Sequence, residues 1–209
     1  MNNNQPMSIH FLERAATLGA WLGGAGLLIS ATFIVVELVL RKTLGVSLGG
    51  ADEVAGYVLA ISTAWAFPIT LLRRAHIRVD VCYSHMPAKV KVALDLFALA
   101  CLGVFVGTLT YHVWNVLLDS IHYQAVSNTP LQIRQWIPQS LWVAGYLFFS
   151  FVIVALFATS VQMVTKGRWR DAARLIGINS VEEEIVEELQ SAPSPAAFHN
   201  DTAKPVTQA

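Results

Sequence analysis

Long apolar runs separated by short polar segments are the main pattern of this chain. Four runs stand out, at about residues 18–40, 54–72, 92–118 and 140–164. A hydrocarbon core of about 30 Å is crossed by about 20 apolar residues in an α-helix, and each run reaches or approaches that length. The pattern therefore predicts an all-α integral membrane protein with four transmembrane helices.

The polar segments complete the predicted domain order. Residues 1–17 form an N-terminal segment, and residues 18–165 form the four-span membrane domain. Residues 166–190 join a basic segment to an acidic helix. Residues 191–209 have the composition of a disordered tail, since they are rich in proline, alanine and polar residues.

Lysine and arginine are distributed unevenly between the two sides of the predicted membrane domain. Five lie between the second and third spans: Arg73, Arg74, Arg78, Lys89 and Lys91. Four more lie in the segment directly after the fourth span: Lys166, Arg168, Arg170 and Arg174. The opposite side holds three: Arg41, Lys42 and Arg134. Because basic residues favour the cytoplasmic side, both termini and the central loop are predicted to be cytoplasmic.

Composition agrees with a membrane protein and excludes one class of partner. The 209 residues are 55% hydrophobic and 13% charged, with a mean hydropathy of +0.52, whereas soluble domains carry about 25% charged residues. The net charge is zero. A chain without excess positive charge is not expected to bind nucleic acid.

Small residues in two of the spans are candidates for helix packing. Gly19 and Gly23 are four residues apart, and Gly103 and Gly107 repeat this spacing. Small residues at this interval allow helix backbones to approach closely, although glycine is also common in membrane helices without such a role. Hydroxyl groups within the spans are expected to bond to their own helix backbone: Ser62, Thr63, Thr108 and Thr110.

The spans carry few groups that could do chemistry. Glu37 lies one turn from Arg41, and Asp95 lies one turn from Lys91, so both acids are expected to form pairs at the membrane interface. Of the six histidines only His112 lies within a span, which argues against haem held by paired histidines. The two cysteines lack partners at metal-ligand spacing. No catalytic residue, metal or cofactor is predicted, and such a chain is expected to work as one subunit among others.

The segment "LLRRAHIRVDVCYSHMP", residues 71–87, gathers an unusual number of charges. Topology alone explains its basic content, with arginines reaching lipid phosphate at the inner membrane surface. It does not explain the order His76-Ile77-Arg78-Val79-Asp80.

That order carries a resemblance to a known family. The stretch "ADEVAGYVLAISTAWAFPITLLRRAHIRVDVCYSHMP" resembles the signature region of the small permease subunit of tripartite ATP-independent periplasmic (TRAP) transporters. The matching pieces are Asp52-Glu53, Tyr57, Arg74, the order from His76 to Asp80, and Pro87. The stretch "NTPLQIRQWIPQSLWVAGYLFF" resembles the region that opens the family's fourth span. The resemblance covers about residues 15–165, and departs from the family pattern at Phe67-Pro68 and Arg73-Arg74.

The resemblance implies an auxiliary subunit, not an enzyme. It would brace a large multi-span permease of the bacterial inner membrane in a sodium-driven uptake system, to which a periplasmic binding protein delivers an organic acid. An outer docking surface would include Asp52, Glu53 and Trp136. The inner loop would contact lipid and the large subunit through Arg73, Arg74, His76, Arg78 and Asp80. A membrane anchor or assembly subunit of another complex is the alternative.

Overall fold

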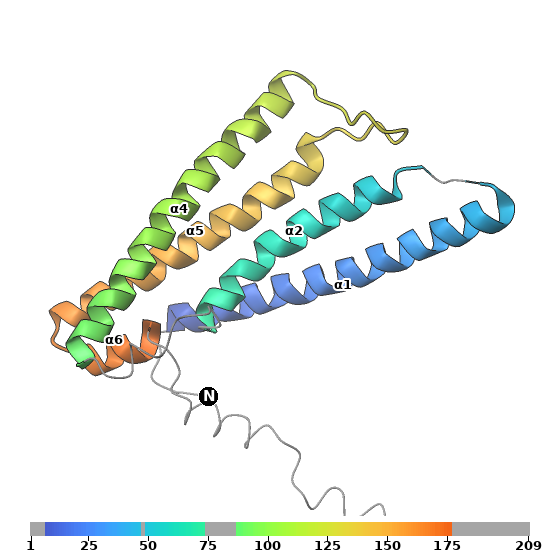
Figure 1. The fold of residues 1–209 in the computed structure, drawn as a ribbon. Helices are drawn as coiled ribbons and strands as arrows, with labels where there is room; N and C mark the ends of the chain where they lie inside the picture. Colours follow the sequence, from blue (N-terminus) through green and yellow to red (C-terminus); the bar gives the residue numbers. More distant parts are fainter. Residues whose placement is uncertain (1–6, 47–48, 74–86, 177–209) are drawn as a thin grey trace, which may run out of the picture. The chain divides into compact units, whose positions relative to one another are not determined.

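The computed structural model describes residues 7–46, 49–73 and 87–176, and these ranges hold five α-helices (Figure 1). Four of them are long: α1 (Met7–Leu44), α2 (Ala51–Leu72), α4 (Ala88–His122) and α5 (Trp136–Thr165). The fifth is the short α6 (Trp169–Ile176). The four long helices are long and apolar enough to cross a membrane, which confirms the predicted all-α, four-span class.

Local sequence explains where the helices begin and end. Pro87 has an extended backbone, and its carbonyl accepts the amide protons of Val90 and Lys91, so α4 starts immediately after it. Arg73 ends α2, where its amide donates to the carbonyl of Ile69 over 2.9 Å. Pro68 lies inside α2, which continues through it.

Neighbouring helices pack in the order α1, α2, α5, α4 (Figure 1), and α6 packs on both α4 and α5. The main cluster of buried apolar side chains draws most of its members from α4, α5 and α6, and one each from α1 and α2. The whole cluster consists of Leu12, Leu71, Leu99, Val106, Phe149, Val152, Ile153, Leu156, Leu175 and Ile176.

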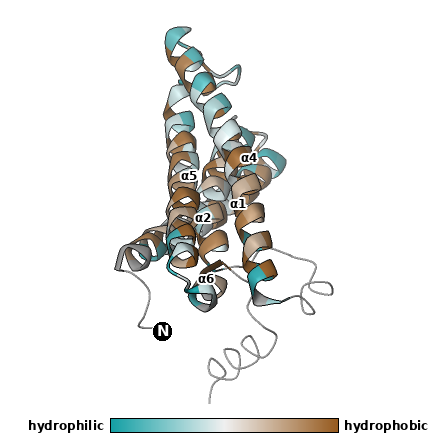
Figure 2. Cartoon of the chain, turned by 90° about the vertical axis from the view of Figure 1, so that its left-hand side faces the viewer, coloured by the Kyte–Doolittle hydropathy of each residue, from teal (hydrophilic) through white to brown (hydrophobic). Residues whose placement is uncertain are grey.

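The outer faces of the long helices are themselves apolar. Figure 2 shows hydrophobic residues along the middle of the helices, with hydrophilic residues gathered towards their ends. Trp21, Leu28, Val104 and Phe105 are among the many large apolar side chains that are exposed. A helix that is hydrophobic on all sides is typical of a membrane span, where lipid covers the outward face.

Glycines bring α1 against α2. A Cβ atom at Gly19 would lie 2.9 Å from Cε3 of Trp65, and one at Gly23 would lie 3.1 Å from Cα of Ser62. The Ser62 hydroxyl donates to the carbonyl of Gly23 over 3.0 Å. The expectation that Ser62 bonds to its own helix is therefore wrong, because the bare Gly23 backbone comes within its reach.

The other three hydroxyl groups bond to their own helices as predicted. Thr63 donates to Leu59, Thr108 to Val104 and Thr110 to Val106, at 2.8–2.9 Å. Thr110 also lies 2.9 Å from the Ser150 hydroxyl, which links α4 to α5. On the same helix, a Cβ at Gly103 would lie 3.3 Å from Ile153, whereas one at Gly107 would meet nothing within 4 Å.

The close contact between α2 and α5 depends on Gly145. A Cβ there would lie 2.8 Å from Cβ of Ala64 and 3.1 Å from Cδ1 of Trp65. The Trp65 indole N–H donates to the carbonyl of Leu141 over 3.0 Å, and its ring stacks on Phe148 with 5.9 Å between centroids. Trp65 thus packs on both α1 and α5 and joins the two halves of the bundle.

Candidate functional site at the start of α2

The segment that joins α4 to α5 folds into a short hairpin, residues 125–135. The Ser127 amide donates to the carbonyl of Ile133 over 2.9 Å, and the Gln135 amide donates to that of Ala125 over 3.0 Å. The Gln132 amide donates to the Thr129 carbonyl over 3.1 Å and closes the tip. These hydrogen bonds lie within the hairpin and hold its two arms together.

Glu53, in the first turn of α2, fastens this hairpin. One of its carboxylate oxygens accepts the Tyr57 hydroxyl over 2.6 Å, and the other accepts the Thr129 hydroxyl. The Ser127 hydroxyl oxygen lies 2.9 Å from that of Thr129 and accepts the Thr129 amide over 3.2 Å. Hydrogen bonds to an ionised carboxylate are about twice as strong as neutral ones.

Apolar packing adds to these hydrogen bonds. Gly50 precedes α2 with a φ of 102°, a left-handed conformation that L-residues with a side chain rarely adopt. A Cβ atom at Gly50 would overlap Leu131 at the hairpin tip, and one at Gly49 would lie 3.4 Å from Pro130. We call the set Gly50, Glu53, Tyr57, Thr129 and Leu131 the hairpin contact.

Of the three residues of the predicted docking surface, Glu53 belongs to this contact, and Asp52 and Trp136 neighbour it in the chain. Asp52 is exposed on the first turn of α2, next to the half-buried Glu53. Two carboxylates in this turn suit the positive end of the helix dipole. Trp136 begins α5 directly after the hairpin and is 37% exposed. Other exposed apolar side chains at this end are Tyr123, Val126, Leu131 and Ile137.

At the opposite end of α2 the structure describes only one residue of the predicted inner interface. Arg73 is exposed and caps α2. The other four lie outside the described residues, and their role stays a prediction: Arg74, His76, Arg78 and Asp80.

The fourth span is followed by an element that the sequence reasoning missed. Helix α6 begins with a salt bridge of 2.7 Å between Arg168 Nε and Asp171, and it buries Ala172, Leu175 and Ile176. Apolar residues at positions i, i+3 and i+4 were the signal that could have predicted it. In α4, Asp95 is buried, with 2% of its surface exposed, and its pairing with Lys91 at the membrane interface stays a prediction.

The sequence reasoning also missed Gly50, Thr129 and Gly145 as residues with specific roles. The hairpin contact joins one carboxylate to hydroxyl groups and brings apolar packing to the same place, all within this chain. Within residues 7–46, 49–73 and 87–176, no group of three His, Cys, Asp or Glu could hold a metal ion.

Comparison with known proteins gives one family. The model of the family described as "Tripartite ATP-independent periplasmic transporters, DctQ component" matches residues 30–163, which is more than half of the chain. No curated protein and no solved structure matches the chain.

Proposed function

Because the chain belongs to the DctQ component family of TRAP transporters, we propose that it is the small auxiliary subunit that braces the large permease. The family works with a large permease and a substrate-binding protein. The family match over residues 30–163 carries this proposal. The four long apolar helices make the chain a multi-pass membrane protein, and the bacterial inner membrane is its proposed location.

The proposed orientation places both chain termini and the basic segment 73–91 in the cytoplasm. Basic residues gather on this side, with five in that segment and four within residues 166–174. Since α2 crosses the membrane between Ala51 and Leu72, its start and the hairpin contact would face the periplasm.

The hairpin contact, with Asp52 and Trp136 beside it, is the proposed docking face for the periplasmic binding protein. Several features support this role. Exposed aromatic and apolar side chains lie together with an exposed carboxylate, as at the centre and rim of protein interfaces. Glu53 and Gly50 hold the hairpin in one conformation, so little conformational entropy would be lost on docking.

Sodium coupling and an organic-acid substrate are the finer parts of the proposal. They come from the family resemblance, and in such a system the substrate and sodium sites belong to the large permease. The described spans are apolar in their middle parts. A transport site usually places ionisable groups near the bilayer centre, so these spans support an auxiliary role.

Reconstitution of uptake tests the proposed function. Proteoliposomes are prepared with the large permease alone or with the permease and this chain, and the binding protein, an organic acid and a sodium gradient are then added. We expect uptake only when this chain is present and the gradient is inward. Equal uptake by the permease without this chain would contradict the role as a required subunit.

A further inference from the structure

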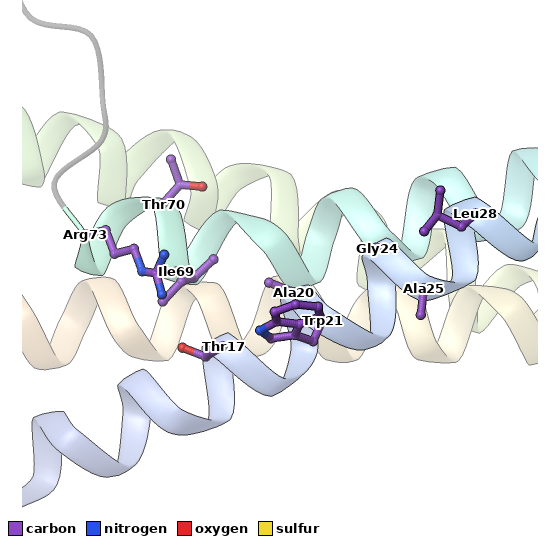
Figure 3. Close-up of a pocket in the computed structure, with 9 residues that line it drawn as sticks. All are labelled: Thr17, Ala20, Trp21, Gly24, Ala25, Leu28, Ile69, Thr70 and Arg73. Carbon is purple, nitrogen blue, oxygen red and sulfur yellow. The ribbon is translucent and has the colours of Figure 1, made fainter. Parts of the chain in front are cut away.

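A groove of about 510 Å³ lies between α1 and α2, away from the hairpin contact (Figure 3). Its walls come from one face of α1 and from the last turns of α2. The lining residues are Thr17, Ala20, Trp21, Gly24, Ala25, Leu28, Ile69, Thr70 and Arg73. Figure 3 shows Arg73 at one end of this groove, Leu28 at the other, and Trp21 between them.

The length of the groove corresponds to one membrane leaflet. From Thr17 to Leu28 the α1 helix rises about 16 Å, at about 1.5 Å per residue. Half of a hydrocarbon core of about 30 Å is about 15 Å. Arg73 follows the last residue of the α2 span, which is the level of the lipid headgroups.

Gly24 leaves open space along the groove. A Cβ atom at Gly24 would meet nothing within 4 Å, although one at the neighbouring Gly23 would press on Ser62 of α2. The α1 helix therefore uses adjacent glycines for two purposes, one to pack on α2 and one to leave space. Trp21 and Leu28 stand beside this space and are 75% and 73% exposed.

The charge at one end completes the site. Arg73 is exposed, and among the described residues its guanidinium forms no ion pair. An arginine binds phosphate through paired N–H groups and keeps its charge at the membrane surface. An apolar groove one leaflet long with a cation at its headgroup end matches a phospholipid in both shape and charge.

We propose that the α1–α2 groove binds a phospholipid, with one acyl chain along Ala20, Gly24 and Ala25 and its phosphate on Arg73. With the orientation given under the proposed function, this is a lipid of the cytoplasmic leaflet, where anionic headgroups are enriched. A transmembrane helix of the large subunit fits less well, because such a helix crosses both leaflets, whereas the groove is about one leaflet long.

Native mass spectrometry tests the site in the protein as it is assembled. The chain is purified together with the large permease from nanodiscs of phosphatidylethanolamine and phosphatidylglycerol, and retained phospholipid is counted per chain. Gly24→Leu fills the groove, and Arg73→Gln removes the cation from an exposed position where folding is not at risk. Gly56→Leu and Arg134→Gln are the matched controls, because neither residue lines the groove. A Cβ atom at Gly56 would meet nothing within 4 Å, and Arg134 is an exposed arginine on the hairpin.

We expect one retained phospholipid per wild-type chain, and a retained fraction about tenfold lower in both groove variants. That factor corresponds to about 1.4 kcal/mol of binding free energy. Both controls should retain lipid like the wild type. Wild-type retention in Gly24→Leu or in Arg73→Gln would overturn the proposal.

The same samples separate this site from its alternative and from the proposed function. Loss of the permease from Gly24→Leu with lipid retained would assign the groove to a helix of the large subunit and overturn the lipid site. A different result would separate the two proposals. If no permease accompanies the wild-type chain, but the wild type retains lipid and both groove variants lose it, the lipid site stands and the transporter role fails.

Discussion

Replacing Gly145 with leucine will force α2 away from α5 and lower the stability of the bundle more than any other single change we propose. Even a Cβ atom would lie 2.8 Å from Ala64 and 3.1 Å from Trp65, so a whole leucine side chain has no space. Overpacking of a tight contact costs about 1–3 kcal/mol of unfolding free energy. Separation of the helices also breaks the hydrogen bond from Trp65 to Leu141, and such bonds are worth about 0.6 kcal/mol in membrane bundles.

A thermal unfolding measurement in mild detergent, followed by size-exclusion chromatography, checks this result. A loss of about 3 kcal/mol lowers the melting temperature of a chain of this size by about 6–12 °C. Gly107→Leu is the matched control, because Gly107 is also inside a long helix but faces open space. Equal melting temperatures for Gly145→Leu and Gly107→Leu would show that the α2–α5 contact does not determine the stability of the bundle.

Replacing Gly50 with valine will reduce uptake at least tenfold while the chain still inserts and assembles. Valine at a φ of 102° is strained, and its Cβ would overlap Leu131, so the hairpin tip must leave the start of α2. The Thr129 hydroxyl would then no longer reach Glu53. If this face receives the binding protein, a loss of about 1.4 kcal/mol in docking free energy gives the tenfold effect.

The initial uptake rate at a low concentration of binding protein is the measurement, with the amount of assembled complex determined in parallel. Gly45→Val is the matched control, since Gly45 also has a positive φ, of 67°, but has nothing within 4 Å of its Cβ position. The Gly45→Val variant therefore has a strained backbone but no overlap with another side chain, whereas Gly50→Val has both. Wild-type uptake in Gly50→Val, or an equal loss in both variants, would contradict a docking role for the hairpin contact.

The four spans were predictable because hydropathy is a local property of the chain. The helices extend beyond the apolar runs, as at α1, which begins at Met7 and ends at Leu44, whereas its apolar run covers about residues 18–40. Hydropathy marks the part of a helix that needs lipid around it. Backbone hydrogen bonding continues past that part wherever no residue interrupts it.

The contacts between helices could not be predicted in the same way. A helix that is apolar on all sides gives no sign of which face meets its neighbour. Gly19 and Gly23 were candidates from their spacing, whereas Gly145 belongs to no such pair and its contact with Ala64 appears only in three dimensions. The same holds for Ser62, whose bond to Gly23 depends on how α1 and α2 are rotated.

The hairpin contact was only partly visible in the sequence. Asp52, Glu53 and Trp136 were chosen from the family resemblance, and Glu53 proves to be a residue that fastens the hairpin. Its partner Thr129 lies 76 residues away, and Leu131 reaches Gly50 over a similar distance along the chain. No short-range pattern connects residues so far apart, because their meeting depends on how α2, α4 and α5 pack.

The most direct test of the subunit role is purification of the tagged chain from its native membranes in mild detergent, with mass spectrometry of the proteins that accompany it. We expect a large, many-spanning permease in equal amount, because the chain belongs to the DctQ component family and bracing requires a stable complex. A chain that purifies alone, or with unrelated proteins, would contradict this role and favour a membrane anchor or assembly subunit of another complex.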